Sequence, residues 1–214
     1  MLLLILEIIG TISFAISGAV VAIKAKFDLF GVAFVGVITA MGGGILRDIL
    51  IGRYPPAVFT NFYIFLIAVI TSIVVFIVIY KNKSRFSILD GIIEYVNNFF
   101  DAVGLAAFSV MGTEVAFVFG FSDNMFLAVT LGVLTGIGGG IFRDILTDTT
   151  PFVFKKHIYA IASIIGACLY YLLRISFDNL ALISAVSMIL VVVIRMLATK
   201  YHWSLPKIKL DNEK

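Results

Sequence analysis

Seven long apolar runs, separated by short polar segments, dominate the chain. Each run is close to the ~20 residues that a helix needs to cross the hydrocarbon core of a bilayer. Because the runs are continuous rather than alternating between apolar and polar positions, they favour helices over the strands of a transmembrane barrel. The pattern predicts an all-α integral membrane protein with seven transmembrane helices, at about residues 3–23, 29–51, 60–80, 99–119, 125–147, 157–174 and 180–198.

The composition agrees with a lipid environment. Of the 214 residues, 61% are hydrophobic and 14% are charged, and the mean hydropathy is +1.12. A soluble domain usually has about a quarter charged residues, so this chain could not cover a water-facing surface. The small net charge of +3 suits membrane topology better than nucleic-acid binding, which needs a basic face. The single cysteine, Cys168, excludes an intrachain disulfide and a cysteine-based metal site.

The distribution of charge predicts the orientation. No basic residue precedes the first apolar run, so we interpret it as a retained span rather than a secretory signal. Seven spans place the connecting segments on alternate membrane faces, and these two faces differ in charge. One face holds few charged residues, mostly acidic or isolated: Glu7, Arg53, Asp123, Arg174 and Asp178. The other face holds most of the basic residues: Lys24, Lys26, Lys81, Lys83, Arg85, Lys155, Lys156, Lys200, Lys207, Lys209 and Lys214. Positive residues concentrate in cytoplasmic loops, which predicts a cell-membrane protein with its N-terminus outside and its C-terminus in the cytoplasm.

An internal repeat organises the chain. The string Gly-Gly-Gly-Ile-Leu-Arg-Asp-Ile-Leu at residues 42–50 recurs at 138–146 with eight of nine positions identical. Further matches extend the repeat on both sides: Gly36 with Gly132, Thr39 with Thr135, Pro55 with Pro151, Tyr63 with Tyr159, and Gly10, Phe14 and Gly18 with Gly104, Phe108 and Gly112. Three glycines and an Arg-Asp pair at fixed offsets indicate a true duplication.

The repeat divides the chain into units of three spans. An odd number of spans makes the second copy enter the membrane from the opposite side, and transport sites often lie where such inverted repeats meet. The predicted layout is a first repeat (1–80), a cytoplasmic connection (81–98), an inverted second repeat (99–175), a seventh helix (176–199) and a cytoplasmic tail (200–214).

The glycine triplets in spans two and five have two interpretations. Each glycine weakens a helix by about 1 kcal/mol relative to alanine, so the spans can bend or break beside an ion pathway. Alternatively, small residues let helices pack closely. Packing explains the spaced glycines well and the contiguous triplets less well. The residues concerned are Gly42, Gly43, Gly44, Gly138, Gly139 and Gly140.

The Arg47-Asp48 and Arg143-Asp144 pairs follow one turn after the triplets. A charge inside the membrane is costly and by default marks a pathway, although charges near helix ends can also reach the headgroups. Because adjacent side chains on a helix point about 100° apart, we expect pairing across the pseudo-two-fold axis instead. The prediction is that Arg47 pairs with Asp144 and Arg143 with Asp48.

Other polar residues give weaker signals. Ser13 and Ser17 lie one turn apart and either line a pore or bond to their own helix. The repeated Thr39 and Thr135 are further pore-lining candidates, and Glu114 is a lone carboxylate in an apolar run with a candidate pore-facing or gating role. His157 and His202 are far apart in the sequence and suggest no metal site. Tyr63 and Tyr159 are near span ends, where tyrosines often form an aromatic belt at the membrane surface.

Several function classes lack their motifs. The sequence has no Walker loop, no GxSxG and no HExxH, so ATP-driven pumping and hydrolysis have no recognisable site, and we expect neither an enzyme nor a cofactor. No TVGYG filter and no regularly spaced voltage-sensing arginines are present.

The duplicated Gly-Gly-Gly-x-x-Arg-Asp string resembles the prokaryotic trimeric intracellular cation (TRIC) channel family, which also carries a glycine-transporter label. The resemblance covers about residues 3–198. It implies two inverted three-helix bundles plus a seventh helix, a homotrimer in the lipid bilayer, and one ion pathway inside each protomer. It also implies that spans two and five kink at the triplets beside that pathway.

These observations give one function hypothesis and two rivals. The residues alone indicate a transport pathway at the repeat interface. The resemblance adds a passive channel for monovalent cations, with potassium as the expected permeant ion and sodium as the other candidate. The rivals are a secondary transporter of a small amino acid such as glycine, in which broken helices cradle the substrate, and a membrane scaffold whose triplets only pack helices.

Overall fold

The computed structural model describes residues 2–82, 88, 90–155 and 158–203, and every described element is a helix. Seven helices are long and apolar enough to cross a membrane, as the hydropathy pattern predicts. In chain order they are α1 (Leu2–Lys24), α2 (Leu29–Leu50), α4 (Phe62–Lys81), α6 (Asp90–Val118), α7 (Met125–Leu146), α9 (Ile158–Ser176) and α10 (Leu180–Lys200). Two four-residue helices, α3 (Ala57–Thr60) and α8 (Phe152–Lys155), precede α4 and α9.

Side-chain caps begin several of the spans where the sequence changes from polar to apolar. Asp28 accepts a hydrogen bond from the Gly31 amide at the start of α2, and Asn124 accepts one from Leu127 at the equivalent point of α7. Such caps satisfy amide groups that the helix itself leaves unpaired. The two copies of the repeat therefore start their central helix in the same way.

The connection between the two repeats is shorter than the predicted 81–98, because α6 begins at Asp90 rather than at residue 99. The 81–98 segment is therefore helical over its second half. At 29 residues, α6 is about 43 Å long, more than the ~30 Å hydrocarbon core requires. Most residues of its first two turns are exposed, and Asp90 forms an ion pair with Lys24 at 2.7 Å. Hydropathy marks where a helix meets lipid, not where it begins.

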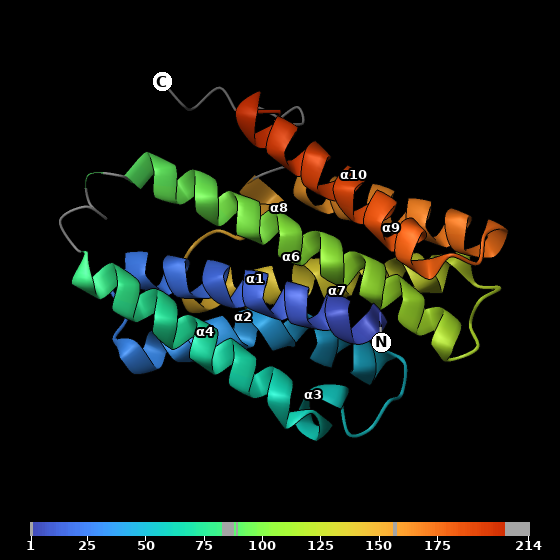
Figure 1. Cartoon of the computed structure of the whole chain (residues 1–214), viewed down its shortest axis with the longest axis horizontal. Coiled ribbons are helices and arrows are strands. Elements are labelled where there is room, and N and C mark those ends of the chain that lie inside the picture. Colours follow the sequence, from blue (N-terminus) through green and yellow to red (C-terminus); the bar gives the residue numbers. More distant parts are fainter. Residues whose placement is uncertain (1, 83–87, 89, 156–157, 204–214) are drawn as a thin grey trace, which may run out of the picture.

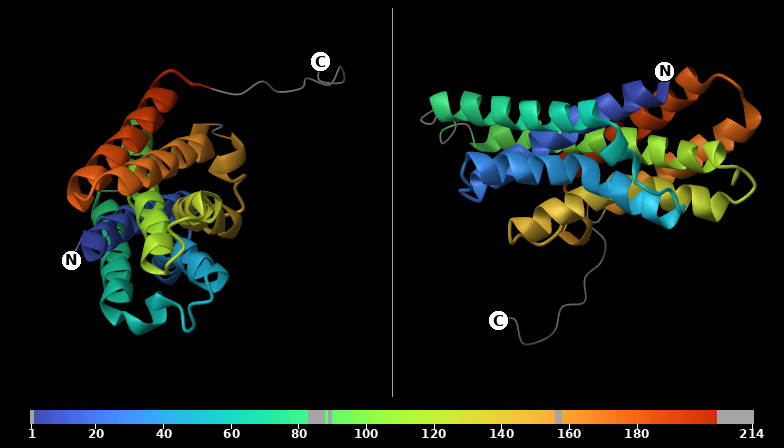
Figure 2. Two further views of the ribbon diagram at one scale, coloured as in Figure 1. Left: turned by 90° about the vertical axis from the view of Figure 1, so that its right-hand side faces the viewer. Right: turned by 90° about the horizontal axis from the view of Figure 1, so that it is seen from below.

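Four helices make the centre of the bundle. α1 packs on α2, α2 on α7, α7 on α6 and α6 on α1, which closes a ring. α4 covers α1 and α2 on one side, while α9 covers α6 and α7 on the other, and α10 lies against α6 and α9 (Figures 1 and 2). α6 is the most buried span and α4 the least.

The two three-helix units are inverted. The equivalent helices run in opposite directions, α1 to α6, α2 to α7 and α4 to α9, as the colours along each helix in Figure 1 show. Reciprocal contacts relate the units: a Cβ at Gly10 would touch the Phe108 ring, and a Cβ at Gly104 would touch the Phe14 ring. The Phe14 and Phe108 rings also contact each other, 5.3 Å apart at their centroids. The pseudo-two-fold axis therefore passes close to these two rings.

Candidate functional site: buried charges at the crossing of α2 and α7

The glycine triplets lie where α2 crosses α7. A Cβ on Gly43 would overlap the carbonyl oxygen of Thr135, and a Cβ on Gly139 would overlap the carbonyl oxygen of Thr39. A Cβ on Gly42 would contact the Phe142 side chain of α7, and a Cβ on Gly138 would contact the Leu46 side chain of α2. The first two glycines of each triplet therefore let the two backbones approach closely.

The third glycine of each triplet has a different environment. The nearest atom to a Cβ on Gly44 would be the guanidinium of Arg47, at 3.7 Å. A Cβ on Gly140 would meet the Tyr159 hydroxyl at 3.2 Å and the Arg143 guanidinium at 3.8 Å. Close packing therefore accounts for the first two glycines of each string, whereas the third lies beside the arginine that follows it.

Neither helix breaks at its triplet. α2 is helical throughout Leu29–Leu50 and α7 throughout Met125–Leu146. Close contact with the opposing helix compensates for the low helix propensity of glycine, since tertiary packing provides most of a helix's stability. The predicted break that would free backbone carbonyls is therefore absent from these two helices.

The Arg-Asp pairs are buried and pair within themselves. Arg47 Nε and Nη2 both lie 2.8 Å from Asp48 Oδ1, and Arg143 Nε lies 2.8 Å from Asp144 Oδ1. The predicted pairing across the pseudo-two-fold axis is therefore wrong. The 100° rule describes Cβ directions, and the three methylenes of arginine are long enough to bring the guanidinium back to the next residue. Headgroup contact is also contradicted, because 3% of the Arg47 side chain and none of Arg143 is exposed.

The second carboxylate oxygen of each aspartate accepts a backbone hydrogen bond from the loop that follows. Asp48 Oδ2 accepts the amide of Ala57, the first residue of α3, and Asp144 Oδ2 accepts the amide of Phe152, the first residue of α8, both at 2.7 Å. The carboxylates therefore fix the loops that return the chain to α4 and α9. This structural role is identical in the two repeats.

In the second repeat, Arg143 gathers additional partners from two other helices. Its Nη1 lies 2.6 Å from Asp101 Oδ1 on α6 and 2.7 Å from the Ser17 hydroxyl on α1. Ser17 thus bonds across helices rather than to its own. Ser13, one turn earlier, is buried as well, but it is not among the groups that contact Arg143.

Arg195 of α10 completes this cluster. Its guanidinium lies over the Tyr159 ring at 4.6 Å, and 2% of the residue is exposed. Among the residues that the structure describes, several buried polar atoms of the cluster lack hydrogen-bond partners: Asp101 Oδ2, Arg143 Nη2, the Tyr159 hydroxyl, and Arg195 Nε and Nη2. Buried polar atoms are normally satisfied by protein or water, so bound water is expected at this cluster.

Tyr159 is a correction to the aromatic-belt prediction, because 1% of it is exposed. Its counterpart is Ile64 rather than Tyr63, which is 80% exposed. The amide that caps onto the aspartate comes nine residues after Asp48 and eight after Asp144, so the first loop is one residue longer. That insertion shifts the register of α4 by one position.

The remaining candidates lie apart from the Arg-Asp clusters. The hydroxyls of Thr39 and Thr135 each donate to the carbonyl four residues earlier in their own helices, at 2.6 Å. Glu114 is not a lone carboxylate, since Tyr170 and Arg174 of α9 donate to it at 3.0 and 3.2 Å. Other predicted positions lie outside the described residues: His157, Lys83, Arg85, Lys156, Lys207, Lys209 and Lys214.

Sequence reasoning missed Asp101 and Arg195, and it used Glu7 only as an indicator of topology. Asp101 and Arg195 lie within apolar runs, so they were counted as part of the predicted spans and not considered as candidate site residues. Asp101 could have been found, because the offset that relates Gly10 to Gly104 also relates Glu7 to Asp101. Arg195 carries no such signal, since α10 belongs to neither repeat.

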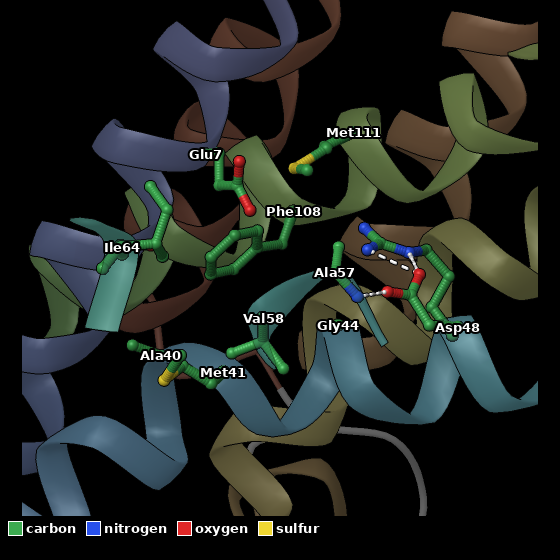
Figure 3. A pocket seen from close by; sticks show the side chains of 12 residues that line it. Glu7, Ala40, Met41, Gly44, Asp48, Ala57, Val58, Ile64, Phe108 and Met111 are labelled. Atoms are coloured by element: carbon green, nitrogen blue, oxygen red, sulfur yellow. Dashed lines mark hydrogen bonds and ion pairs between the residues drawn. The ribbon is translucent and has the colours of Figure 1, made fainter. Parts of the chain in front are cut away.

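A small pocket lies beside the Arg-Asp pair of the first repeat. It has room for one water-sized body, with a volume of about 20 Å³. Glu7 of α1, Gly44 and Asp48 of α2, and Phe108 and Met111 of α6 surround it (Figure 3). Thr11 and Arg47 also line it. No group of three or more His, Cys, Asp or Glu in the described ranges converges on a metal-binding arrangement.

Fold and site together define the class: a seven-span helical membrane protein built from an inverted repeat around buried charged clusters. The family model described as "Glycine transporter" matches the chain twice, at residues 4–80 and 98–174. The UPF0126 inner membrane protein YadS of Escherichia coli (strain K12) is 36% identical over 210 residues, covering 96% of both chains.

Solved structures of channels share the fold. A prokaryotic TRIC channel crystallised in 0.5 M KCl is 34% identical with a TM-score of 0.84, covering 95% of this chain and 98% of that one. The TRIC channel orthologue from Rhodobacter sphaeroides is 26% identical with a TM-score of 0.83, covering 94% and 98%. The chain belongs to the prokaryotic TRIC channel family, whose sequence model carries the glycine-transporter description.

Proposed function

We propose that the protein is a channel for monovalent cations, principally potassium, with a pathway inside each protomer between the two inverted repeats. The observation that carries the proposal is the meeting of both Gly-Gly-Gly-x-x-Arg-Asp strings at the α2–α7 crossing, with their charges buried. Charges are retained inside a membrane chiefly where they serve a pathway. The TRIC channel structures provide the independent support.

The size of the pocket favours a channel over the rival transporter of a small amino acid. A pocket of about 20 Å³ admits one water-sized body, which is close to a potassium ion in size and smaller than glycine. The continuous α2 and α7 also lack the exposed helix ends that hold a carboxylate substrate in broken-helix transporters.

Recording from purified protein in planar bilayers tests this proposal. We expect unitary currents in KCl, smaller currents in NaCl and a reversal potential in a KCl gradient that follows the cation. Saturable glycine uptake into proteoliposomes without unitary currents would establish the transporter instead. If the protein shows neither unitary currents nor glycine uptake, the result supports the scaffold.

We further propose a homotrimer in the cell membrane, as in the channels named above, with no enzymatic activity and no nucleic-acid partner. Relatives named as inner membrane proteins support the location. Chemical cross-linking of the protein in membranes should give a ladder that ends at three copies. A ladder that ends at two would contradict the trimer.

The proposed orientation places the N-terminus outside and the C-terminus in the cytoplasm. In a Cys168→Ala background, cysteines at Asn82 and Asp211 should react only after a membrane-permeant reagent enters the cell, while one at Asp123 should react from outside. Asn82 and Asp123 are both exposed at helix ends, so access is decided by the membrane alone. Labelling of 82 and 123 from the same side would rule out this topology.

A further inference from the structure

The two repeats carry equivalent charged clusters that differ in one respect. Arg143 pairs with Asp144 and with Asp101, whereas Arg47 pairs with Asp48 alone among the described acidic residues. The position equivalent to Asp101 is Glu7, which is half-buried and lines the pocket of the first repeat. Glu7 is therefore left as a carboxylate without an ion-pair partner in the described part of the chain.

A second oxygen in the pocket is also unpartnered. Thr11 lies one turn after Glu7 on the same face of α1, is fully buried and lines the pocket. Its hydroxyl has no hydrogen-bond partner among the described residues. A buried hydroxyl without a partner is costly, so a ligand that interacts with its oxygen atom would be stabilising here.

The charges of the pocket sum to a net negative value. Glu7 and Asp48 contribute two negative charges and Arg47 one positive charge. Arg47 acts on Glu7 most strongly, and Arg53 also acts on it, but Arg53 is half-exposed after α2, where water screens its charge. The equivalent cluster of the second repeat is neutral, because α10 adds Arg195 to Arg143 against Asp101 and Asp144.

The second repeat also leaves less room at this point. Tyr159 places its hydroxyl 3.2 Å from where a Cβ of Gly140 would stand, while the corresponding space at Gly44 has the Arg47 guanidinium 3.7 Å away as its nearest atom. Ile64, the counterpart of Tyr159, presents an apolar edge to the pocket instead (Figure 3). The net negative charge therefore favours a cation beside the Arg-Asp pair of the first repeat.

We infer that the pocket between α1, α2 and α6 binds one monovalent cation, held by the Glu7 carboxylate and the Thr11 hydroxyl. Hard cations take oxygen ligands, and the volume suits a single ion of about the size of a water molecule. The site lies toward the membrane face that carries the N-terminus. The inference deepens the proposed channel function and rests on it for its physiological meaning, but the site itself is a binding property of the folded chain.

Thallium, a potassium analogue, tests the site by calorimetry on the purified full-length protein in detergent, in a buffer with a large organic cation. Wild type should bind one thallium ion per protomer at this site. Glu7→Gln, which keeps the shape of the side chain, should weaken the affinity by about tenfold or more, because it removes the only unpaired charge of the pocket. Thr11→Val is isosteric and removes an unsatisfied hydroxyl, so it should weaken binding without lowering stability.

A matched control and a functional readout make the result decisive. Glu94→Gln changes the same charge at an exposed position of α6 and should leave binding unchanged. In bilayers, Glu7→Gln should lower conductance about threefold when low KCl is supplied from the side of the N-terminus, and much less at high KCl, where charge is screened. Thallium binding that persists in Glu7→Gln, or its absence in wild type, would overturn the site. Binding lost in Glu7→Gln together with no unitary current in wild type would leave the site standing and refute the channel.

Discussion

Replacing Gly139 with alanine is expected to destabilise the protein by roughly 1–3 kcal/mol or more, the usual cost of overpacking. The added Cβ would overlap the backbone carbonyl oxygen of Thr39, which cannot rotate away as a flexible side chain can. α2 and α7 must therefore separate. Gly43→Ala should behave alike against the Thr135 carbonyl, and leucine at either position should prevent assembly of the bundle.

Gly44→Ala is the matched control, since its new Cβ meets only the Arg47 guanidinium at ordinary contact distance. All three changes gain the helix propensity of alanine, about 1 kcal/mol, so Gly44→Ala should be neutral or stabilising. Thermal denaturation of the purified protein, followed by the loss of monodisperse material, measures the difference. If Gly139→Ala and Gly44→Ala shift Tm equally, the triplets do not hold the helices together.

Removing the carboxylate of Asp101 is the second change with a large expected effect. Asp101→Asn leaves the fully buried Arg143 with one acidic partner instead of two, and breaking a buried pair in this way costs about 3–5 kcal/mol. Arg143→Gln in the Asp101→Asn background should recover part of the loss, because the amide no longer carries an unbalanced charge. Unfolding by SDS titration in mixed micelles measures the four free energies of this double-mutant cycle.

Two further cycles identify what the coupling means. Arg143 with Asp48, which the structure does not pair, should show coupling near zero. Lys24 with Asp90, an ion pair at the exposed ends of α1 and α6, should give no more than about 1 kcal/mol. Equal coupling in all three cycles would mean that burial at the crossing adds nothing to the Arg143–Asp101 interaction.

The sequence determined the spans, the duplication and the positions of the triplets. Lipid forces each crossing segment to be apolar and about 20 residues long, so hydropathy reads the spans directly. The duplicated strings revealed the inverted repeat, because glycines and charges are rare enough in apolar runs to be recognised. Glu7 and Asp101 were available from the same offset.

Only the tertiary structure decided which groups meet. Arg143 finds Asp101 and Ser17 on two helices distant in the chain, and Arg195 arrives from a helix outside the repeat. One extra residue in the first loop puts Ile64 where the second repeat has Tyr159. Hydropathy and repeat offsets describe one helix at a time, whereas partner choice depends on how helices cross and how far long side chains reach. Two copies of nearly the same string therefore end in different environments: one cluster has balanced charges and Tyr159 beside its third glycine, and the other has a net negative charge beside a small pocket.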